Sequence, residues 1–170
     1  MNKKHLLAAF SFLLALLAFN VSVTAQGNRA SPAATATGKV GNANITINYS
    51  SPSVKGRKIW GELVPYGKVW RAGANEATTF ETDKAVKVEG KSLPAGKYSL
   101  FALPGENSWQ VMFNSQTGQS GTQRDASKDV LVVNVKPVTS ATMNERLVYE
   151  VTGKGIVLKW EKLEVPVSIK

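Results

Sequence analysis

The chain has 170 residues, a formal net charge of +9, no cysteine and a single histidine, His5. This length suits one domain, and the absence of cysteine excludes a disulfide framework, a thiol nucleophile and a lipid anchor attached through cysteine. The basic residues are spread thinly rather than clustered, so no nucleic-acid partner is predicted.

Residues 1–25 have the pattern of a secretory signal peptide. A basic start at residues 2–5 precedes an apolar run at residues 6–19, and residues 23–25 fit a small-x-small cleavage site. The run is shorter than the roughly 20 residues that span a bilayer, and no basic cluster follows it, which disfavours a retained membrane anchor. We expect an exported protein, periplasmic or extracellular, with no transmembrane segment in the mature chain. Without the two lysines of this segment, 19 basic and 12 acidic residues leave a net charge of +7.

Residues 26–39 are mostly Ala, Ser, Thr, Gly and Pro, with no bulky apolar side chain. Because this segment has little to bury, we expect a disordered linker. Residues 40–170 are expected to form one folded domain.

From Val40 onward apolar and polar residues alternate, which is the pattern of half-buried strands. Within residues 97–103, the run from Tyr98 to Leu103 is apolar on both faces apart from Ser99, and it predicts a central strand. The pattern indicates an all-β fold, an antiparallel β-sandwich, with a small closed barrel as the alternative. About nine short strands are predicted, at residues 45–49, 77–82, 86–89, 97–103, 109–114, 130–135, 147–152, 156–161 and 165–169, and residues 69–71 could open another.

The segment Gly61–Ala77, together with the preceding Trp60, interrupts this alternation and concentrates unusual side chains. Aromatic faces beside Arg, Asn and Glu suit the binding of sugars or peptides. The alternative, which is compatible with binding, is a structural plug that closes one end of the sandwich. Six residues are candidates for ligand binding: Trp60, Tyr66, Trp70, Arg71, Asn75 and Glu76.

Two further interpretations concern individual side chains. Arg71 could pair with a buried Glu76 or meet an anionic ligand. Trp109 and Trp160 lie at inward positions of good strands and are predicted to belong to the core.

Once His5 leaves with the signal peptide, the chain contains neither His nor Cys. Nucleophiles activated by histidine and zinc sites built on His or Cys are then excluded, and no metal or other cofactor is predicted. Glu62 and Glu76 are the one acid pair that suggests a carboxylate-dependent hydrolase. A Ser-Lys dyad is formally possible, and no residue is assigned a catalytic role.

Three blocks of sequence carry a resemblance. They read LVPYGKVWRxGANEAT from Leu63, LPAGKYSLF from Leu93, and Trp-x-Val-x-Phe-Asn from Trp109. These blocks resemble a secreted bacterial family catalogued only as a domain of unknown function. The resemblance extends over essentially all of residues 40–170. It implies an export signal and a compact, mostly β domain, and it implies no established activity.

The leading hypothesis is an exported, non-catalytic binding module for a glycan or another component of the cell envelope. The alternatives are a carboxylate-dependent hydrolase of cell-surface polymers and a purely structural envelope protein. The sequence predicts no particular oligomeric state.

Overall fold

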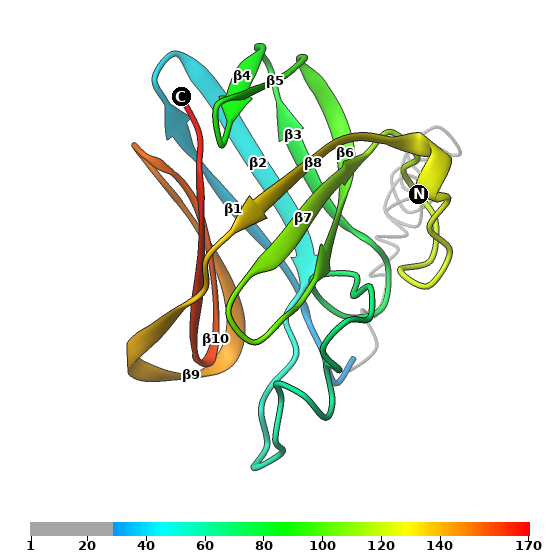
Figure 1. Ribbon diagram of the computed structural model, residues 1–170, viewed down its shortest axis with the longest axis vertical. Coiled ribbons are helices and arrows are strands. Elements are labelled where there is room, and N and C mark those ends of the chain that lie inside the picture. Colours follow the sequence, from blue (N-terminus) through cyan, green and yellow to red (C-terminus); the bar gives the residue numbers. More distant parts are fainter. Residues whose placement is uncertain (1–28) are drawn as a thin grey trace, which may run out of the picture.

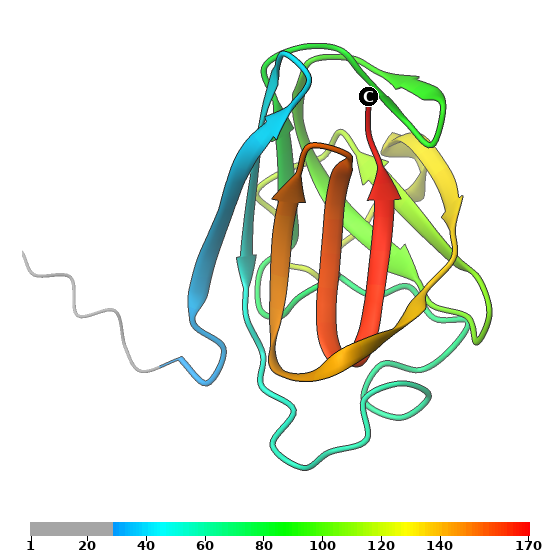
Figure 2. The same ribbon diagram turned by 90° about the vertical axis from the view of Figure 1, so that its left-hand side faces the viewer.

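The computed structural model describes residues 29–170, so the predicted signal peptide lies outside the described part of the chain. The strands pair in antiparallel fashion and lie in two layers, which confirms the predicted all-β antiparallel sandwich (Figure 1). One layer is a six-stranded sheet, and the other is built on a long hairpin that lies across it (Figure 2).

The six-stranded sheet has the order β1-β2-β3-β6-β7-β8. Its strands are β1 (Ala33–Val40), β2 (Ala43–Ser50), β3 (Thr78–Thr82), β6 (Gly96–Leu103), β7 (Trp109–Asn114) and β8 (Asp129–Val135). A small separate hairpin consists of β4 (Val86–Val88) and β5 (Lys91–Leu93), and the short 3-10 helix η1 (Ala126–Lys128) precedes β8.

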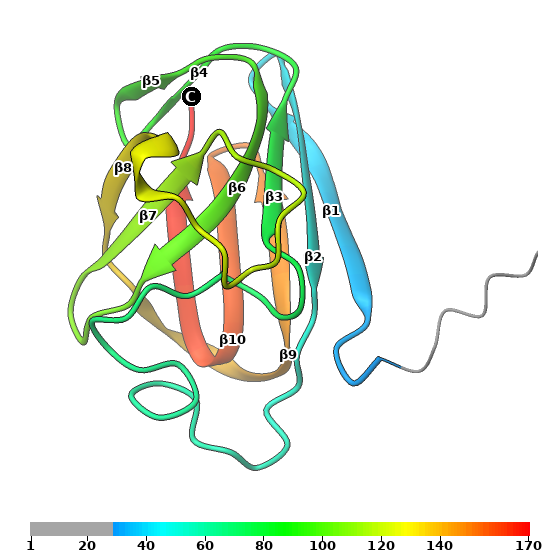
Figure 3. The same ribbon diagram turned by 90° about the vertical axis from the view of Figure 1, so that its right-hand side faces the viewer.

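Strand β6 is central, as its two apolar faces predicted. It pairs with β3 on one side and β7 on the other. Its outward Phe101 packs with Met112 and Ala77 in a small cluster outside the main core. The loop of residues 115–128 lies over this outer face (Figure 3), which explains why both faces of β6 are apolar.

The second layer consists of β9 (Val138–Thr152) and β10 (Gly155–Ser168). Two separate strands were predicted at residues 156–161 and 165–169, whereas the structure has one long strand that bends at Glu161, where φ is 56°. After the bend, the second half of β10 runs back beside the first half (Figure 2). The two halves are close enough that a β-carbon at Gly155 would lie 2.1 Å from the carbonyl oxygen of Val167.

The prediction of a disordered linker at residues 26–39 is wrong for residues 33–39, which belong to β1. This edge strand pairs with β2 along its whole length, from Ala33 opposite Ser50 to Val40 opposite Ala43. Its side chains are small, which lets the strand approach β9 in the opposite layer, and Ala36 packs against the core. Backbone pairing supplies most of the order in β1. The prediction relied on bulky apolar residues and therefore missed this strand.

The core lies between the two layers and contains the large side chains expected from the alternation. Trp109 and Trp160 are each 1% exposed, which confirms their predicted place in the core. The strand suggested at residues 69–71 does not form. Trp70 makes only an isolated antiparallel bridge with Ala102, because the long β2–β3 connection touches the sheet there and then leaves it.

Candidate functional site

All four tryptophans of the chain pack together where the β2–β3 connection meets the sandwich. Trp109 and Trp160 come from opposing layers, and Trp60 and Trp70 come from the connection. The centroids of contacting rings lie between 5.0 Å and 6.3 Å apart, and Trp70 stacks on Trp160 with an interplanar angle of 16°. Trp60 and Trp70 are only partly buried, yet both pack against the main core. Their rings therefore help to join the connection to both layers.

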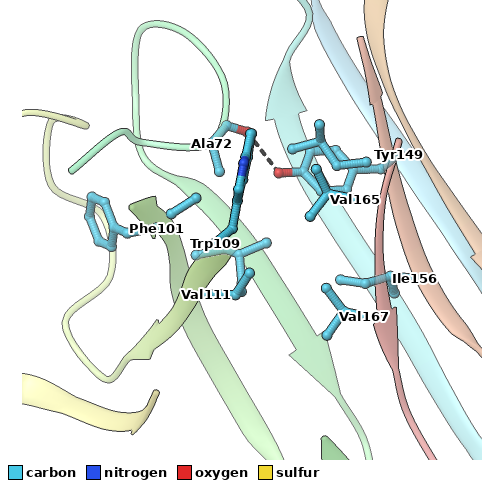
Figure 4. Close-up of a pocket in the computed structure, with 11 residues that line it drawn as sticks. Ala72, Phe101, Trp109, Val111, Tyr149, Ile156, Val165 and Val167 are labelled. Atoms are coloured by element: carbon cyan, nitrogen blue, oxygen red, sulfur yellow. Dashed lines mark hydrogen bonds between the residues drawn. The ribbon is translucent and has the colours of Figure 1, made fainter. Parts of the chain in front are cut away.

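Hydrogen bonds fix the backbone of Ala72, the residue that follows Arg71, and thereby help to orient Arg71. We call this fixed point the Ala72 anchor. Ala72 has a φ of 50°, in the left-handed region that residues with side chains rarely adopt. Its carbonyl oxygen accepts a hydrogen bond from the Tyr149 hydroxyl at 2.8 Å (Figure 4). The same oxygen also accepts a hydrogen bond from the Thr78 hydroxyl at 3.0 Å. Burial raises the pKa of Tyr149, so its phenol remains a donor across the physiological range.

The cavity beside this anchor is too small to be a ligand site. It has a volume of about 20 Å³ and lies between the layers, bordered by apolar side chains such as Trp109, Val111 and Val167 (Figure 4). A cavity needs about 10–15 Å³ to hold a single water molecule. Because this cavity is only slightly larger and its lining is apolar, we interpret it as a packing defect.

Tyr149→Phe is expected to lower the free energy of unfolding by about 1 kcal/mol, the usual net contribution of one hydrogen bond. The loss is small because the Ala72 carbonyl keeps the bond from Thr78. Thr78→Val should have a similar effect, whereas the double variant leaves a buried carbonyl without a partner. Urea denaturation of the four proteins measures this coupling. A double variant that costs no more than the sum of the single variants would contradict the shared anchor.

The side chain of Arg71 contacts two parts of the chain: its own segment, Gly61–Ala77, and the loop of residues 115–128. One terminal nitrogen of its guanidinium donates to the carbonyl oxygen of Asn75 at 2.7 Å. The amide of Gly121 donates to the same oxygen at 3.3 Å, and Glu76 bridges Ser120 in antiparallel fashion. Gly121 has to be a glycine, because a β-carbon there would lie 2.4 Å from Cδ of Arg71. The loop and the segment thus form one surface around Arg71.

Glu76 does not pair with Arg71, so that sequence-based interpretation is wrong. Its carboxylate instead bonds to Arg29 at 2.8 Å, and both side chains are exposed. Among residues 29–170, no carboxylate lies within 4.0 Å of Arg71. The charge of Arg71 is therefore left uncompensated within the described protein.

The environment of Glu76 lowers the pKa of its carboxyl. The largest cause is a hydrogen bond from its own backbone N–H, followed by the bond from Arg29. We expect an NMR titration to give Glu76 a pKa below the ordinary value for glutamate. In Arg29→Gln the pKa should rise but remain lowered, because the backbone bond persists. A Glu76 pKa that is unchanged by Arg29→Gln would contradict the ion pair.

This shift also sets the sign of a pH effect. A lowered pKa in the folded state means that the interaction contributes fully above the ordinary glutamate pKa. The contribution is lost as the pH falls through the lowered value. Both partners are exposed, so the effect on global stability should be slight.

Two adjoining grooves border Arg71. The first, which we name the Arg124 groove, has a volume of about 420 Å³. The second, the Arg57 groove, has a volume of about 350 Å³. They share one wall, made of Leu63, Val64, Trp70 and Arg71.

The grooves are lined by cations. Arg124 and Lys68 line the first groove only, Arg57 lines the second only, and Arg71 lines both, whereas no Asp or Glu appears among the described residues that line either one. Arg124 is bound to Asp129 in a mostly buried ion pair, and its guanidinium carbon lies 5.9 Å from the centre of the Phe101 ring. The two grooves therefore form one continuous basic surface.

A third depression has a different character. It has a volume of about 510 Å³ and is bordered by residues of β8 and β10, away from the tryptophans. Its lining includes Lys136 and Lys154 together with Glu89, whose carboxylate accepts a hydrogen bond from the Ser168 amide. Charges of both signs make it a weaker candidate for selective binding, although it is larger.

The six sequence candidates separate into two groups. Trp70 and Arg71 line both grooves, and Asn75 lines the Arg57 groove. Trp60, Tyr66 and Glu76 line neither: Trp60 packs in the tryptophan cluster, Glu76 binds Arg29, and the exposed Tyr66 ring would lie 3.2 Å from a β-carbon at Gly61.

Sequence reasoning missed Arg57, Lys68 and Arg124 as lining residues. Arg57 and Lys68 lay within or beside the highlighted segment but were not singled out. Arg124 comes from a distant polar loop, and its only sequence signal was the glycine at 121, which permits that loop to approach Arg71 closely.

Within residues 29–170 no group of three or more Asp, Glu, His or Cys side chains is placed to hold a metal ion. No helix in this part of the chain has the length and apolar character needed to cross a membrane.

Comparison with known proteins gives a family and no close relative. No curated protein and no solved structure is significantly similar to the chain. Residues 31–169 match the family described as Protein of unknown function (DUF2911), a range that includes all ten strands. The match covers most of the chain and agrees with the expected domain of unknown function. The protein therefore belongs to this family.

Proposed function

We propose that this protein is an exported, non-catalytic binding module for a glycan or another component of the cell envelope. The ligand would lie in the adjoining Arg57 and Arg124 grooves. The observation that carries the proposal is the shared wall of Leu63, Val64, Trp70 and Arg71, which combines apolar surface with a directed hydrogen-bond donor. Such a combination is typical of ligand sites.

The apolar part of the surface suits sugar rings. Leu63 and Val69 are each 46% exposed, and both line the Arg124 groove, so they place apolar surface beside its cations. Sugars present C–H faces to such side chains and hydroxyl groups to neighbouring polar groups. The export signal predicted at residues 1–25 supports a ligand outside the cytoplasm.

The acids of this region favour binding over hydrolysis. Glu62 pairs with Lys58 at 3.2 Å, Glu76 pairs with Arg29, and neither carboxylate lines a groove. A general acid needs a raised pKa, whereas the pKa of Glu76 is lowered. The carboxylate-hydrolase alternative therefore has no supporting geometry.

The test uses exposed side chains, so that folding is not at stake. Immobilised glycans, both neutral (dextran, xylan) and acidic (polygalacturonate, heparin), are used to retain the purified mature protein. The variant Leu63→Ser with Val69→Ser should lose most of the retention, because it removes the apolar lining. The control is Val130→Ser with Val132→Ser on β8, whose side chains are 49% and 38% exposed and lie outside the grooves.

Retention that survives in the control and falls in the groove variant supports the proposal. Equal retention of both variants, or no retention of the wild type on any glycan or on an insoluble envelope fraction, would contradict it. Circular dichroism confirms that each variant is folded.

A further inference from the structure

We infer that the ligand of these grooves is a polyanionic glycan, with Arg71 binding one acidic group at the junction and Arg57, Lys68 and Arg124 serving further acidic groups along the chain. This inference rests on the proposed function and gives its ligand a chemical class. The acidic groups that we expect share one chemistry: each is an oxyanion carried on a sugar, whether carboxylate, sulfate or phosphate.

Arg71 has hydrogen-bond donors and a charge that the described residues do not satisfy. A guanidinium has five N–H donors, and among the described residues Arg71 makes one hydrogen bond, to the neutral carbonyl of Asn75. Its charge has no acidic partner within residues 29–170. A planar fork with free donors is suited to bidentate binding of an oxyanion.

The side chain of Arg71 is fixed in place by its surroundings before any ligand binds. The Asn75 carbonyl and the backbone of Gly121 hold its side chain from behind, and the Ala72 carbonyl that follows it is fixed by two buried hydroxyl groups. Little side-chain freedom remains to be lost on binding, which favours affinity. The side chain borders both grooves, so the guanidinium lies where a ligand would pass from one to the other.

Acidic side chains are absent from the described linings of both grooves. Arg57 donates only to the backbone carbonyls of Ser53 and Val54, and Lys68 has no carboxylate within 4.0 Å among the described residues. Unpaired lysines also occur elsewhere in the described protein, for example Lys136 and Lys154, but the depression that those two border also contains Glu89. The two grooves therefore present cations to a ligand without a competing carboxylate in their lining.

The arrangement of these cations favours a polymer over a small anion. Arg57 borders one groove, Arg71 both, and Lys68 and Arg124 the other. An extended chain that lies through both grooves meets positive charge at successive places, whereas a single small anion would use only part of the surface. Arg124 already pairs with Asp129, so we expect it to contribute less than Arg71 or Lys68.

A sugar chain also fits better than a nucleic acid. Bound single strands usually stack their bases on exposed aromatic rings. Trp70 stacks instead on Trp160, and Phe101 is fully buried, so the exposed apolar side chains in the lining are the aliphatic Leu63, Pro65 and Val69. Small aliphatic surfaces can contact sugar C–H groups but give a base no platform.

The experiment compares two double variants that lose the same charge. Lys68→Gln with Arg71→Gln removes two cations from the grooves. Lys136→Gln with Lys154→Gln removes two from the mixed-charge depression bordered by β8 and β10. Binding of soluble polygalacturonate, heparin and a phosphorylated mannan, with dextran as the neutral comparison, is measured by calorimetry at low and moderate salt.

We expect wild type to bind at least one acidic glycan, and to bind it less tightly as salt rises. The groove variant should bind about tenfold or more weakly, since hydrogen bonds to charged groups are the strong ones. The control should remain within about twofold, because exposed charges far from the ligand are screened. The three acidic glycans show whether carboxylate, sulfate or phosphate is preferred.

Three outcomes would overturn the inference. Equal losses in the two variants would show attraction to net charge alone. Tighter binding of a single-stranded DNA oligonucleotide, lost in the groove variant, would assign the grooves to nucleic acid. Binding of dextran alone, lost in Leu63→Ser with Val69→Ser and unaffected by Lys68→Gln with Arg71→Gln, would keep the proposed function and reject the anionic ligand.

Discussion

Replacing Trp160 by alanine is expected to lower the free energy of unfolding by about 3–5 kcal/mol, the range for large buried aromatic residues. Trp160 is 1% exposed and contacts Trp60 and Trp70. Its ring centroid lies 5.7 Å from that of Trp60 and 5.9 Å from that of Trp70. Truncation would leave a cavity between β10 and the β2–β3 connection. Urea denaturation followed by circular dichroism measures the change.

Trp160→Phe is the matched variant. The indole N–H of Trp160 is buried and has no hydrogen-bond partner among the described residues. Phenylalanine keeps most of the aromatic contact and removes this unpaired donor, so its cost should be less than half that of alanine. If the two variants were equally destabilised, or if alanine cost less than about 1 kcal/mol, which is typical of an ordinary substitution, the cluster would not be a main source of stability.

The second large effect is expected at the turn between β9 and β10. Gly155→Ala should destabilise the protein by about 3 kcal/mol or more, since overpacking and an unfavourable backbone conformation act together. The new β-carbon would lie 2.1 Å from the Val167 carbonyl oxygen and 2.7 Å from the Ile169 amide, and φ at Gly155 is 138°. Both clashing atoms belong to the backbone, so a change of rotamer cannot relieve them.

Gly153→Ala provides the control two residues away. No atom lies within 4 Å of a β-carbon built there, and its φ is outside the positive range that glycine favours. We expect its stability to stay within about 0.5 kcal/mol of wild type, as for other neutral surface changes. Thermal unfolding of both variants measures the difference. A Gly155→Ala protein as stable as Gly153→Ala would mean that the two halves of β10 do not lie side by side.

The strands were predictable wherever side chains alternate clearly. The inward position of Trp109 followed from the alternation, because one face of its strand packs on the core, and the central place of β6 followed from its two apolar faces. The edge strand β1 was missed for the opposite reason. Its alanines and glycine carry little hydrophobic signal, and its order comes from pairing with β2 and from closeness to β9.

The sequence singled out a segment that borders both grooves, but it named only some of the residues that line them. Trp70 and Arg71 stood out because they lie in a dense run of aromatic and polar residues. Of the two partners considered for Arg71, a buried Glu76 or an anionic ligand, the pairing with Glu76 is wrong: Arg71 donates to the backbone carbonyl of Asn75, and Glu76 pairs with Arg29. The partners of Arg71 and Glu76 depend on the backbone geometry at Ala72, which cannot be predicted from the periodicity of the sequence.

Arg124 illustrates a second limit. It is distant from Arg71 in sequence, yet both residues line the Arg124 groove. Arg124 belongs to the loop of residues 115–128, which lies over β6 and β7 (Figure 3). Its pairing with Asp129 across a short stretch of that loop would have suggested an ordinary structural ion pair. Sequence alone gives no reason to group it with Lys68.

The tryptophan cluster has a consequence for the order in which the protein folds. Trp70 supports the shared groove wall, and it stacks on Trp160, which is the last of the four tryptophans in the chain. Contacts between residues so far apart require closure of a long loop, which slows their formation. An intermediate with the six-stranded sheet formed but with β10 undocked would lack the support of this wall. The binding that we propose for the grooves should therefore become possible only at the end of folding, together with the final change in tryptophan fluorescence.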